Sequence, residues 1–472
     1  MGYGEVSAAA RAGFGAGDAP PLPPGLLDQD EPALPAGLGD GDEPVLPTGL
    51  DGTAERAAED TAEEAPAEAA AWPVALSGFL EVRMGARVHD DPYEKRLSLA
   101  EARARGVIEK SGSAVTVRAA ADLLYDHLED SLDLDLEAGS GWLDLREAFV
   151  AARPAGPVDA KLGRQILTWG TGDLLFVNDL FPKDWRAFLL GRDVEYLKAP
   201  SDAAKLSLFT PAANLDVIYT PRFDADRGIT GRRLSYYDAA LARLAGRDAI
   251  IVADVPDRWF RDSETAARLY RTVAGYELAL YGYLGYWKSP AGFDPGSGHA
   301  THPRLRVYGA SARGVLGRGI ASAELGYFAS PDDVAGTDFA VRNGELRVLC
   351  GYEQELVRNV TLGVQYYLEH MRNHDQYRET LPPGQPGMDA DRHVLTTRVT
   401  ALLRGQNLRL TLFGFYSPSD DDGYVRPEAS YRITDHVQVT GGANVFAGAH
   451  DHTFFGQLEN NTNVHVGMRY SY

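Results

Sequence analysis

Residues 464–472 read Val-His-Val-Gly-Met-Arg-Tyr-Ser-Tyr, with an apolar or aromatic side chain at every second position through the final tyrosine. Successive side chains of a β-strand point to opposite faces, so this spacing predicts a strand with one apolar and one polar face. The same period recurs upstream in residues 278–286, 360–369 and 408–412. The sequence therefore predicts that short strands of this kind are the repeating unit of the fold.

The connections between these predicted strands alternate between short and long. Short connections are expected at 274–275, 313–318, 355–359, 404–407 and 434–436, and long ones, rich in Gly, Pro, Asp and His, at 289–302, 330–342, 373–390, 418–423 and 447–460. A soluble β-sandwich would give the same strand period without this alternation. Short turns at one end and long loops at the other are typical of a barrel that crosses a bacterial outer membrane.

The N-terminal half shows the strand period less clearly. Further strands are predicted near 74–88, 96–110, 113–126, 141–153, 157–168, 203–210, 214–221, 235–244, 248–255 and 265–273. The total is about twenty, and sixteen or eighteen stay open, because single-chain barrels of this type have an even number of strands. We therefore expect an all-β fold, a transmembrane antiparallel up-and-down β-barrel of about 16–20 strands. The lumen of such a barrel is too wide for the wall side chains to fill.

Residues 1–71 differ in composition from the rest of the chain. They carry fifteen Asp or Glu and two Arg, so −13 of the chain's net charge of −21 lies there. A Leu-Pro-x-Gly-Leu unit recurs every twelve residues, at 22–26, 34–38 and 46–50. Prolines, repelling charges and few apolar side chains predict a disordered, acidic periplasmic extension, followed by the barrel domain over 72–472. A second interpretation is that 19–52 docks a periplasmic protein partner.

Composition also excludes several classes of protein. An acidic chain lacks the basic face that nucleic acid binding requires, so no nucleic acid partner is expected. The lone Cys350 excludes an intramolecular disulfide and a Cys-based metal site within one chain. No window of about 18 residues is continuously apolar, which excludes a transmembrane helix. No signal peptide is visible in the first residues, yet we expect localisation in the outer membrane, with the signal peptide absent from the given chain.

The longest interruption of the strand pattern is 169–201, which is rich in both charged and aromatic side chains. This segment is too apolar to lie in water, so we expect it to fold back into the barrel mouth as a pore constriction. The alternative is an external loop packed on itself. The predicted constriction residues are Arg164, Gln165, Trp169, Asp173, Asn178, Asp179, Lys183, Asp184, Arg186 and Arg192.

The polar positions of the alternation predict which side chains face the lumen. They include Glu277 and Gln365 and a set of arginines: Arg118, Arg304, Arg306, Arg347, Arg398, Arg409 and Arg469. Two interpretations of these arginines stay open. They could focus a field that favours anionic solutes, or they could pair with Asp and Glu and only support the wall.

Two histidine pairs are candidates for catalytic or metal sites. His370 and His374 are four residues apart, and His450 and His452 are two apart, but neither pair has an identifiable third ligand. Polar loop tips are the better interpretation of both. No Gly-x-x-x-x-Gly-Lys-Ser/Thr phosphate loop occurs. We therefore expect no catalytic residue, no metal, no cofactor and no enzyme activity, and an outer-membrane hydrolase is kept only as a third possibility.

One part of the sequence resembles a known family. Gly163-Arg164-Gln165, followed by Trp169-Gly170 and Asp173, resembles the motif of a proteobacterial porin-like outer-membrane β-barrel family of unknown function, and parts of 351–367 and 455–472 are similar to it as well. The resemblance covers 74–472 and implies a porin-like channel through which small solutes cross the outer membrane, without naming the solute. Tyr470 and Tyr472 resemble the C-terminal signal that the barrel-assembly machinery reads.

The expected partners follow from this resemblance. They are outer-membrane lipid and lipopolysaccharide, the barrel-assembly machinery and an unidentified small solute. The alternative function is a scaffold, in which the barrel sheathes or docks an electron-transfer cytochrome or export machinery and the acidic repeat recruits that partner.

Overall fold

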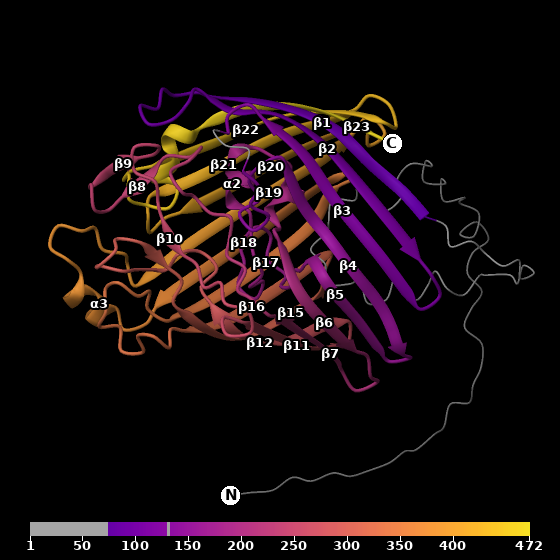
Figure 1. Ribbon diagram of the computed structural model, residues 1–472, viewed down its shortest axis with the longest axis horizontal. Coiled ribbons are helices and arrows are strands. Elements are labelled where there is room, and N and C mark those ends of the chain that lie inside the picture. The colour runs from indigo at the N-terminus through magenta and orange to yellow at the C-terminus, as the bar shows by residue number, and fades with distance from the viewer. Residues whose placement is uncertain (1–73, 130–132) are drawn as a thin grey trace, which may run out of the picture. The chain divides into compact units, whose positions relative to one another are not determined.

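The computed structural model describes residues 74–129 and 133–472. The predictions made for the acidic extension and its repeat, within 1–71, lie outside the described residues. In the described part, eighteen strands form one closed antiparallel sheet, and Figure 1 shows them side by side around the barrel. The predicted fold class, an up-and-down barrel of 16–20 strands, is confirmed.

Each barrel strand pairs with its neighbours in the chain. The ring closes where Phe79–Arg87 of the first strand pairs with Asn463–Ser471 of the last. In order the strands are β1 (Val74–Arg87), β2 (Leu97–Ser111), β3 (Val115–Asp126), β4 (Leu143–Ala155), β5 (Val158–Ile166), β6 (Pro200–Leu208), β7 (Asn214–Thr220), β11 (Glu264–Val273), β12 (Tyr276–Tyr286), β15 (Arg304–Leu316), β16 (Gly319–Ala329), β17 (Glu345–Val357), β18 (Val360–Met371), β19 (Asp391–Leu403), β20 (Leu408–Ser417), β21 (Asp422–Arg432), β22 (Val437–Gly448) and β23 (Asn463–Ser471).

Two strands that the sequence predicted, 235–244 and 248–255, do not join the barrel. These regions form only short strands in the long β7–β11 loop. They are β8 (Tyr236–Asp238), β9 (Arg243–Ala245) and β10 (Ala253–Asp254), and β10 joins β13 (Gly292–Phe293) and β14 (Ala300–Thr301) in a separate three-stranded sheet. A membrane-crossing strand needs about 9–11 residues, and these pieces are too short. The predicted count of about twenty was therefore too high by two.

The connections sort to the two ends of the barrel as predicted, except that the loop predicted as long at 418–423 is only a short connection between Ser417 and Asp422. Two-residue turns such as Ala274-Gly275, where both residues have positive φ (51° and 83°), lie at the end that we call the turn end. This geometry matches the twist of the paired strands. The longer connections, which carry β8–β10, α3 (His374–Thr380) and η2 (Gly456–Asn461), lie at the opposite loop end (Figure 1).

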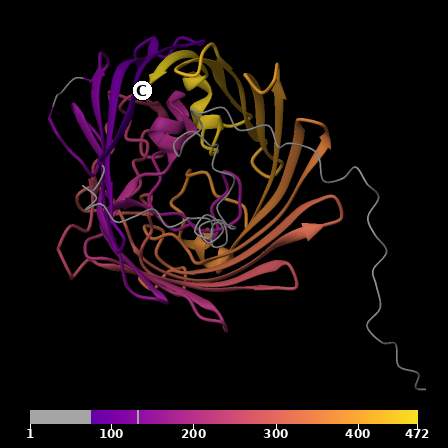
Figure 2. The same cartoon turned by 90° about the vertical axis from the view of Figure 1, so that its right-hand side faces the viewer.

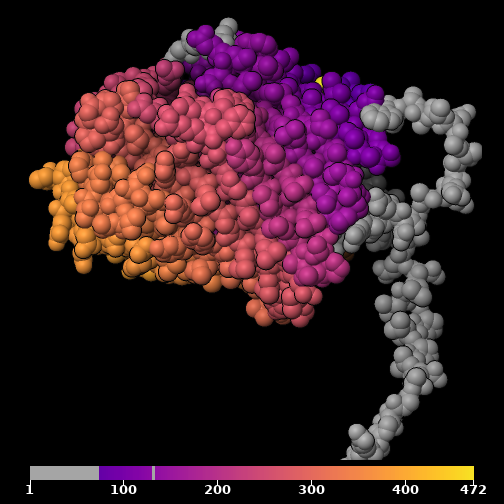
Figure 3. Space-filling view, turned by 60° about the horizontal axis from the view of Figure 1, so that its bottom comes forward, coloured from indigo at the N-terminus to yellow at the C-terminus, as the bar shows by residue number. Residues whose placement is uncertain are grey.

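The polarity of the barrel is the reverse of that of a water-soluble protein. On β1, Leu80, Val82 and Met84 are more than half exposed, whereas Glu81 and Arg83 between them are buried inside. Exposed tyrosines flank this outer apolar surface, for example Tyr276 near the turn end and Tyr308 near the loop end. An apolar band between aromatic girdles is the surface that a transmembrane barrel presents to lipid. Figure 3 shows the outer wall, where the colours change in the order of the strands.

Helices are few and short. Besides α3 and η2, the described residues hold α2 (Trp185–Leu190) and η1 (Val194–Leu197), both in the β5–β6 connection. Among residues 74–129 and 133–472, no helix has the length and apolar character needed to cross a membrane.

Candidate pore constriction

The connection from β5 to β6, residues 167–199, lies inside the barrel, and we call it the lumen segment. Figure 2 shows the magenta chain of this segment, with α2, within the ring of strands. Its fold is set locally, because the Asp184 carboxylate caps α2 by accepting from the Ala187 amide at 2.7 Å. Gly191, with φ of 95°, ends the helix in a left-handed conformation that glycine adopts at little cost.

The first half of the lumen segment is fixed to one carboxylate, Glu324 on β16. Glu324 is buried and accepts hydrogen bonds from the Thr171 amide and hydroxyl, the Gly172 amide at 2.9 Å, and the Asn178 amide and side chain at 3.1 and 2.7 Å. A buried carboxylate is tolerated only with such donors around it. Glu324 therefore anchors residues 171–178 to this wall.

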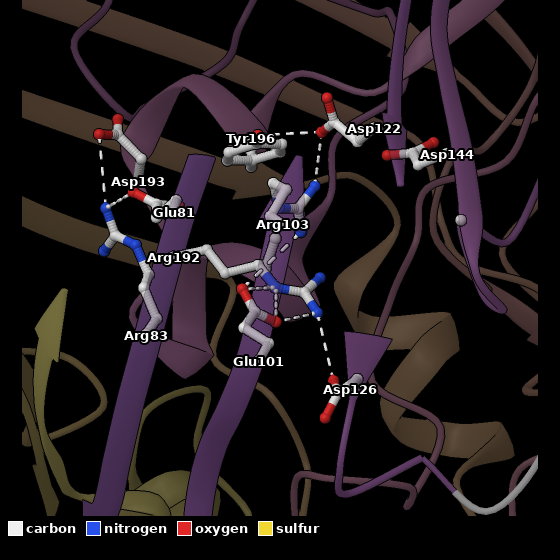
Figure 4. A network of polar contacts seen from close by, with 12 residues as sticks. Glu81, Arg83, Glu101, Arg103, Asp122, Asp126, Asp144, Arg192, Asp193 and Tyr196 are labelled. Atoms are coloured by element: carbon white, nitrogen blue, oxygen red, sulfur yellow. Dashed lines mark hydrogen bonds and ion pairs between the residues drawn. The ribbon is translucent and has the colours of Figure 1, made fainter. Parts of the chain in front are cut away.

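The second half is fixed to the opposite wall. Arg192 donates to Glu101 on β2 at 2.7 and 2.9 Å, and the Tyr196 hydroxyl donates to Asp122 on β3 at 2.9 Å (Figure 4). In a ring of eighteen strands, β2 and β16 are nine strands apart in either direction. The lumen segment therefore spans the barrel from one side to the other.

The wall on the Glu324 side supplies the larger set of apolar contacts to the segment, and we call strands β12 and β15–β19 the apolar arc. Trp169, Val177 and Phe181 of the lumen segment pack in one buried cluster with inward-facing side chains of these strands. The wall members include Tyr281, Tyr283, Leu305, Val307, Phe328, Leu349, Tyr367 and Val394. Burial of each large side chain contributes about 1.5–3 kcal/mol, so this cluster is a major source of stability for the segment.

The wall on the Glu101 side is ionic, and we call strands β23 and β1–β4 the charged arc. The guanidinium groups of Arg103, Arg105 and Arg146 lie 4.1, 5.0 and 5.1 Å from the ring centre of Tyr196. Carboxylates alternate with them, as Arg103 pairs with Asp122 at 2.6 Å. Figure 4 shows Arg103 and Asp122 beside Tyr196 of the segment. The network holds cations and anions together and carries no large excess of either charge.

A second apolar cluster supports α2 beside the charged arc. Phe188, Leu189 and Leu190 pack against inward-facing residues of β2 and β20–β22 and against η2. The wall and loop residues are Leu99, Leu234, Phe413, Tyr424, Phe446, Phe455 and Leu458. The lumen segment thus has apolar contacts on both sides and is a packed part of the barrel interior.

The predicted constriction residues are placed as follows. Asp173, Asn178 and Arg192 bind the wall, Trp169 packs in the apolar cluster, and Asp179 and Lys183 pair with each other at 3.0 Å. Asp184 caps α2, and Arg186 donates to the carbonyls of residues 138 and 139. Arg164 and Gln165 lie on β5 before the segment. Their hydrogen bonds go to wall or loop residues: Leu136, Glu137, Leu145 and Asp202 for Arg164, and the carbonyls of Gly163 and Ala203 for Gln165.

Beside the lumen segment lies a small hollow that is open to solvent. The Arg398 guanidinium closes one side through a two-point ion pair with Asp173, in which Nη2 lies 2.7 Å from Oδ1. The lining combines charged and hydroxyl-bearing or amide side chains: Thr171, Asp173, Arg313, Ser322, Glu353, Gln365, Thr396 and Arg398. Of these, sequence reasoning named Asp173, Gln365 and Arg398.

Most of the arginines predicted to face the lumen occupy inward-facing strand positions. Four of these inward-facing arginines, each on a different strand, pair with carboxylates. The pairs are Arg118 with Glu109 and Glu147, Arg347 with Glu345 and Glu369, Arg398 with Asp173, and Arg469 with Glu81 and Glu195. Arg409 is also on the inward side of β20, between the outward-facing Leu408 and Leu410.

The prediction for Arg304 and Arg306 was wrong, because both face outward. Between them on β15 lie Leu305 and Val307, which are 2% and 0% exposed and belong to the cluster around Trp169. The prediction assumed that inner positions are polar. Here the lumen segment packs apolar side chains against the inner wall. On this part of β15 the apolar side chains therefore face inward and the charged ones face outward.

The histidine pairs lie toward the loop end and make ordinary polar contacts. His370 Nδ1 lies 2.7 Å from Asp391, His374 Nε2 lies 2.9 Å from the Met388 carbonyl, and the rings of His450 and His452 stack at 5.3 Å. In the described ranges, no group of three or more His, Cys, Asp or Glu side chains is arranged to hold a metal ion.

Comparison with known proteins gives matches in structure only. No family model and no curated protein matches the chain. The chain is similar to OccAB3 of Acinetobacter baumannii, with a TM-score of 0.52, 8% identity, and coverage of 84% of this chain and 99% of that one. Salmonella typhi OmpF in complex with daunomycin (TM-score 0.43, 9% identity, 84% and 97% coverage) and a mutant of the Rh. blastica porin (0.37, 11%, 85% and 100%) are more distant.

The likeness to OccAB3 bears on the fold alone, because the identity is so low. The motif at 163–173 and the family that it resembles stay predictions. Residues 74–129 and 133–472 form a closed barrel of eighteen strands, and the likeness to OccAB3 agrees with this fold.

Proposed function

We propose that this protein is a porin-like channel of the outer membrane, in which the lumen segment is a fixed constriction that small solutes must pass. The observation that carries the proposal is the attachment of this segment to opposite walls, at Glu324 and at Glu101. The outer apolar band between tyrosines supports a membrane position, and the long loops would then face the outside.

The hollow beside the segment supports a path for solutes rather than a sealed barrel. It is lined by polar side chains from both the segment and the wall, which replace part of the hydration of a passing solute. The ion pair of Asp173 and Arg398 joins the segment to β19 at this hollow. A solute that passes there meets the carboxylate of Asp173 and the guanidinium of Arg398, which are ion-paired with each other.

The ion pairs also bear on selectivity. Since four of the inward-facing arginines pair with carboxylates, their fields largely cancel at a distance. We therefore expect weak ion selectivity, which favours the interpretation that these arginines support the wall. Strong anion preference would contradict it.

Single-channel conductance in a planar bilayer tests the proposal. Ile166 and Pro200 are direct partners in the β5–β6 pairing, so a short Gly-rich turn can replace 167–199 without changing the register. The conductance of this variant should rise severalfold, because the obstacle across the lumen is gone. An unchanged conductance from a correctly folded, heat-modifiable barrel would remove the constriction assignment. A salt gradient in the same experiment reports the selectivity.

The scaffold function has less support. The chain's own segment crosses the lumen and packs into two apolar clusters, so it occupies space that a sheathed partner would need. Regular conductance by the purified chain alone would count against a sheath. Co-purification of a haem protein would favour it.

A further inference from the structure

The outer wall carries a group of arginines near the loop end, which we call the outer basic strip: Arg304, Arg306 and Arg372. Arg304 and Arg306 are exposed on the lipid side of β15, on the same face as Tyr308. Arg372 follows β18, and its guanidinium lies 5.1 Å from the ring centre of Tyr327 and donates to the Tyr327 hydroxyl. Tyr327 is the direct strand partner of Tyr308, so the three arginines share one region of the wall.

Two of these cations lack a protein counter-ion. Within the described ranges, no carboxylate forms an ion pair with the guanidinium of Arg304 or Arg306. Asp332 accepts only the backbone N–H of Arg304, at 2.7 Å, and the nearby Asp262 pairs with Arg258 at 3.1 Å. Exposed charges on a surface that faces lipid are costly unless they reach the interface and an anion. The two arginines therefore point to a partner from outside the chain.

Their height on the wall matches the interface. Arg304 is the direct partner of Tyr286, the last residue of β12, and Arg306 is the partner of Leu284 in the exposed apolar band. Tyrosines at strand ends mark the level of lipid headgroups. The strip lies toward the loop end, which is the outer face if the barrel sits in the outer membrane as proposed.

We propose that the outer basic strip binds the phosphate groups of a phosphorylated glycolipid of the outer leaflet, the lipid A part of lipopolysaccharide. Arg304 and Arg306 are two residues apart on one face, about 7 Å along the strand, so their planar guanidinium groups can share one phosphate. The acyl chains would lie over Leu284, Leu280 and Leu325, which are exposed on the same wall. This inference rests on the proposed outer-membrane position but not on conduction.

The test is lipid binding by the purified full-length barrel in detergent, measured by native mass spectrometry with diphosphoryl lipid A. The wild type should retain the lipid, and Arg304→Ser/Arg306→Ser should lower its affinity roughly tenfold or more, because charge-assisted hydrogen bonds to phosphate are lost. Arg304→Lys/Arg306→Lys should keep most of the binding. Arg271→Ser is the matched control, because Arg271 is also an exposed, outward-facing arginine but lies on β11 near the turn end.

The outcomes separate the possible sources of binding. Equal retention by the serine variant and the wild type would overturn the proposal. Equal retention of dephosphorylated lipid A would show acyl packing without a phosphate site, and inorganic pyrophosphate that competes as well as the lipid would show a free-anion site. Each of these results also overturns it. Conductance of the serine variant should equal that of the wild type, so failure here is distinguishable from failure of the channel function.

Discussion

The apolar arc and the charged arc hold the same segment by different physical means. The apolar arc buries aromatic and aliphatic side chains around Trp169 and binds residues 171–178 through the carboxylate of Glu324. The charged arc uses alternating arginines and carboxylates around Tyr196. Apolar burial stabilises in proportion to area, whereas buried ion pairs lose much of their attraction to the cost of desolvation. The comparison suggests that the apolar arc supplies most of the stability and the charged arc sets the orientation of 191–196.

The largest effect is expected for Trp169→Ala. The Trp169 side chain packs against Phe181 and Tyr281 with ring centres 5.0 and 6.0 Å apart, so its removal leaves a cavity in the apolar cluster. The free energy of docking of the lumen segment should fall by about 3–5 kcal/mol. Hydrogen exchange of residues 169–181 in the folded barrel measures this. Trp259 is an exposed loop residue, so Trp259→Ala is the control and should leave the hydrogen exchange of residues 169–181 unchanged.

A smaller effect is expected for Glu324→Gln. The amide keeps the shape of the carboxylate but has one oxygen in place of two, so some of the donors from Thr171, Gly172 and Asn178 lose their acceptor. The cost should be about 1–3 kcal/mol. Single-channel records should show a higher or less steady conductance. Glu355→Gln, near the turn end of the neighbouring β17 and outside the lining of the hollow, is the matched control, and equal records from both variants would contradict the anchor.

The barrel could be predicted from the sequence because period two is a strong and repeated signal. The strand predicted within 278–286 is Tyr276–Tyr286 in the structure, and the turn at Ala274-Gly275 lies where it was expected. Strands at 235–255 were wrongly assigned to the barrel, because alternation in a loop sheet looks the same over a few residues. Length did not separate them either, because the predicted spans 235–244 and 248–255 are as long as a barrel strand such as β7.

The position of the lumen segment could be anticipated from its composition, but its contacts could not. Glu324 lies in a strand of small residues and stands out only as a polar residue on the side opposite Leu325. Its partners are about 150 residues away in the chain, so no local pattern relates them. The error at Arg304 and Arg306 has the same origin, since the polarity of the inner wall depends on what packs against it.

The charged arc should be less sensitive to substitution. Arg192→Met leaves Glu101 with Arg103, whose guanidinium is 3.8 Å away, so the carboxylate keeps one partner. The docking free energy should fall by about 1 kcal/mol, and Arg192→Met/Glu101→Leu should be within about 1 kcal/mol of the wild type. Hydrogen exchange of residues 191–196 measures both. A loss as large as that of Trp169→Ala would reverse the ranking of the two arcs.

A separate effect, outside the two arcs, concerns the β7–β11 loop at the rim and depends on pH. Burial, with the nearby carboxylates of Glu264 and Glu137, raises the pKa of Asp224 from 3.8 to about 8 against the opposing effect of Lys288. The folded loop therefore holds a proton that the detached loop releases, and its attachment should weaken as the pH rises from about 4 to about 8.

Protease cleavage within 221–263 should be faster at pH 9 than at pH 6. Asp224→Asn should remove this difference because the amide stays neutral, whereas Asp257→Asn, an exposed aspartate of the same loop, should keep it. Cleavage rates of the wild type that do not change with pH would show that Asp224 is already ionised in the folded loop.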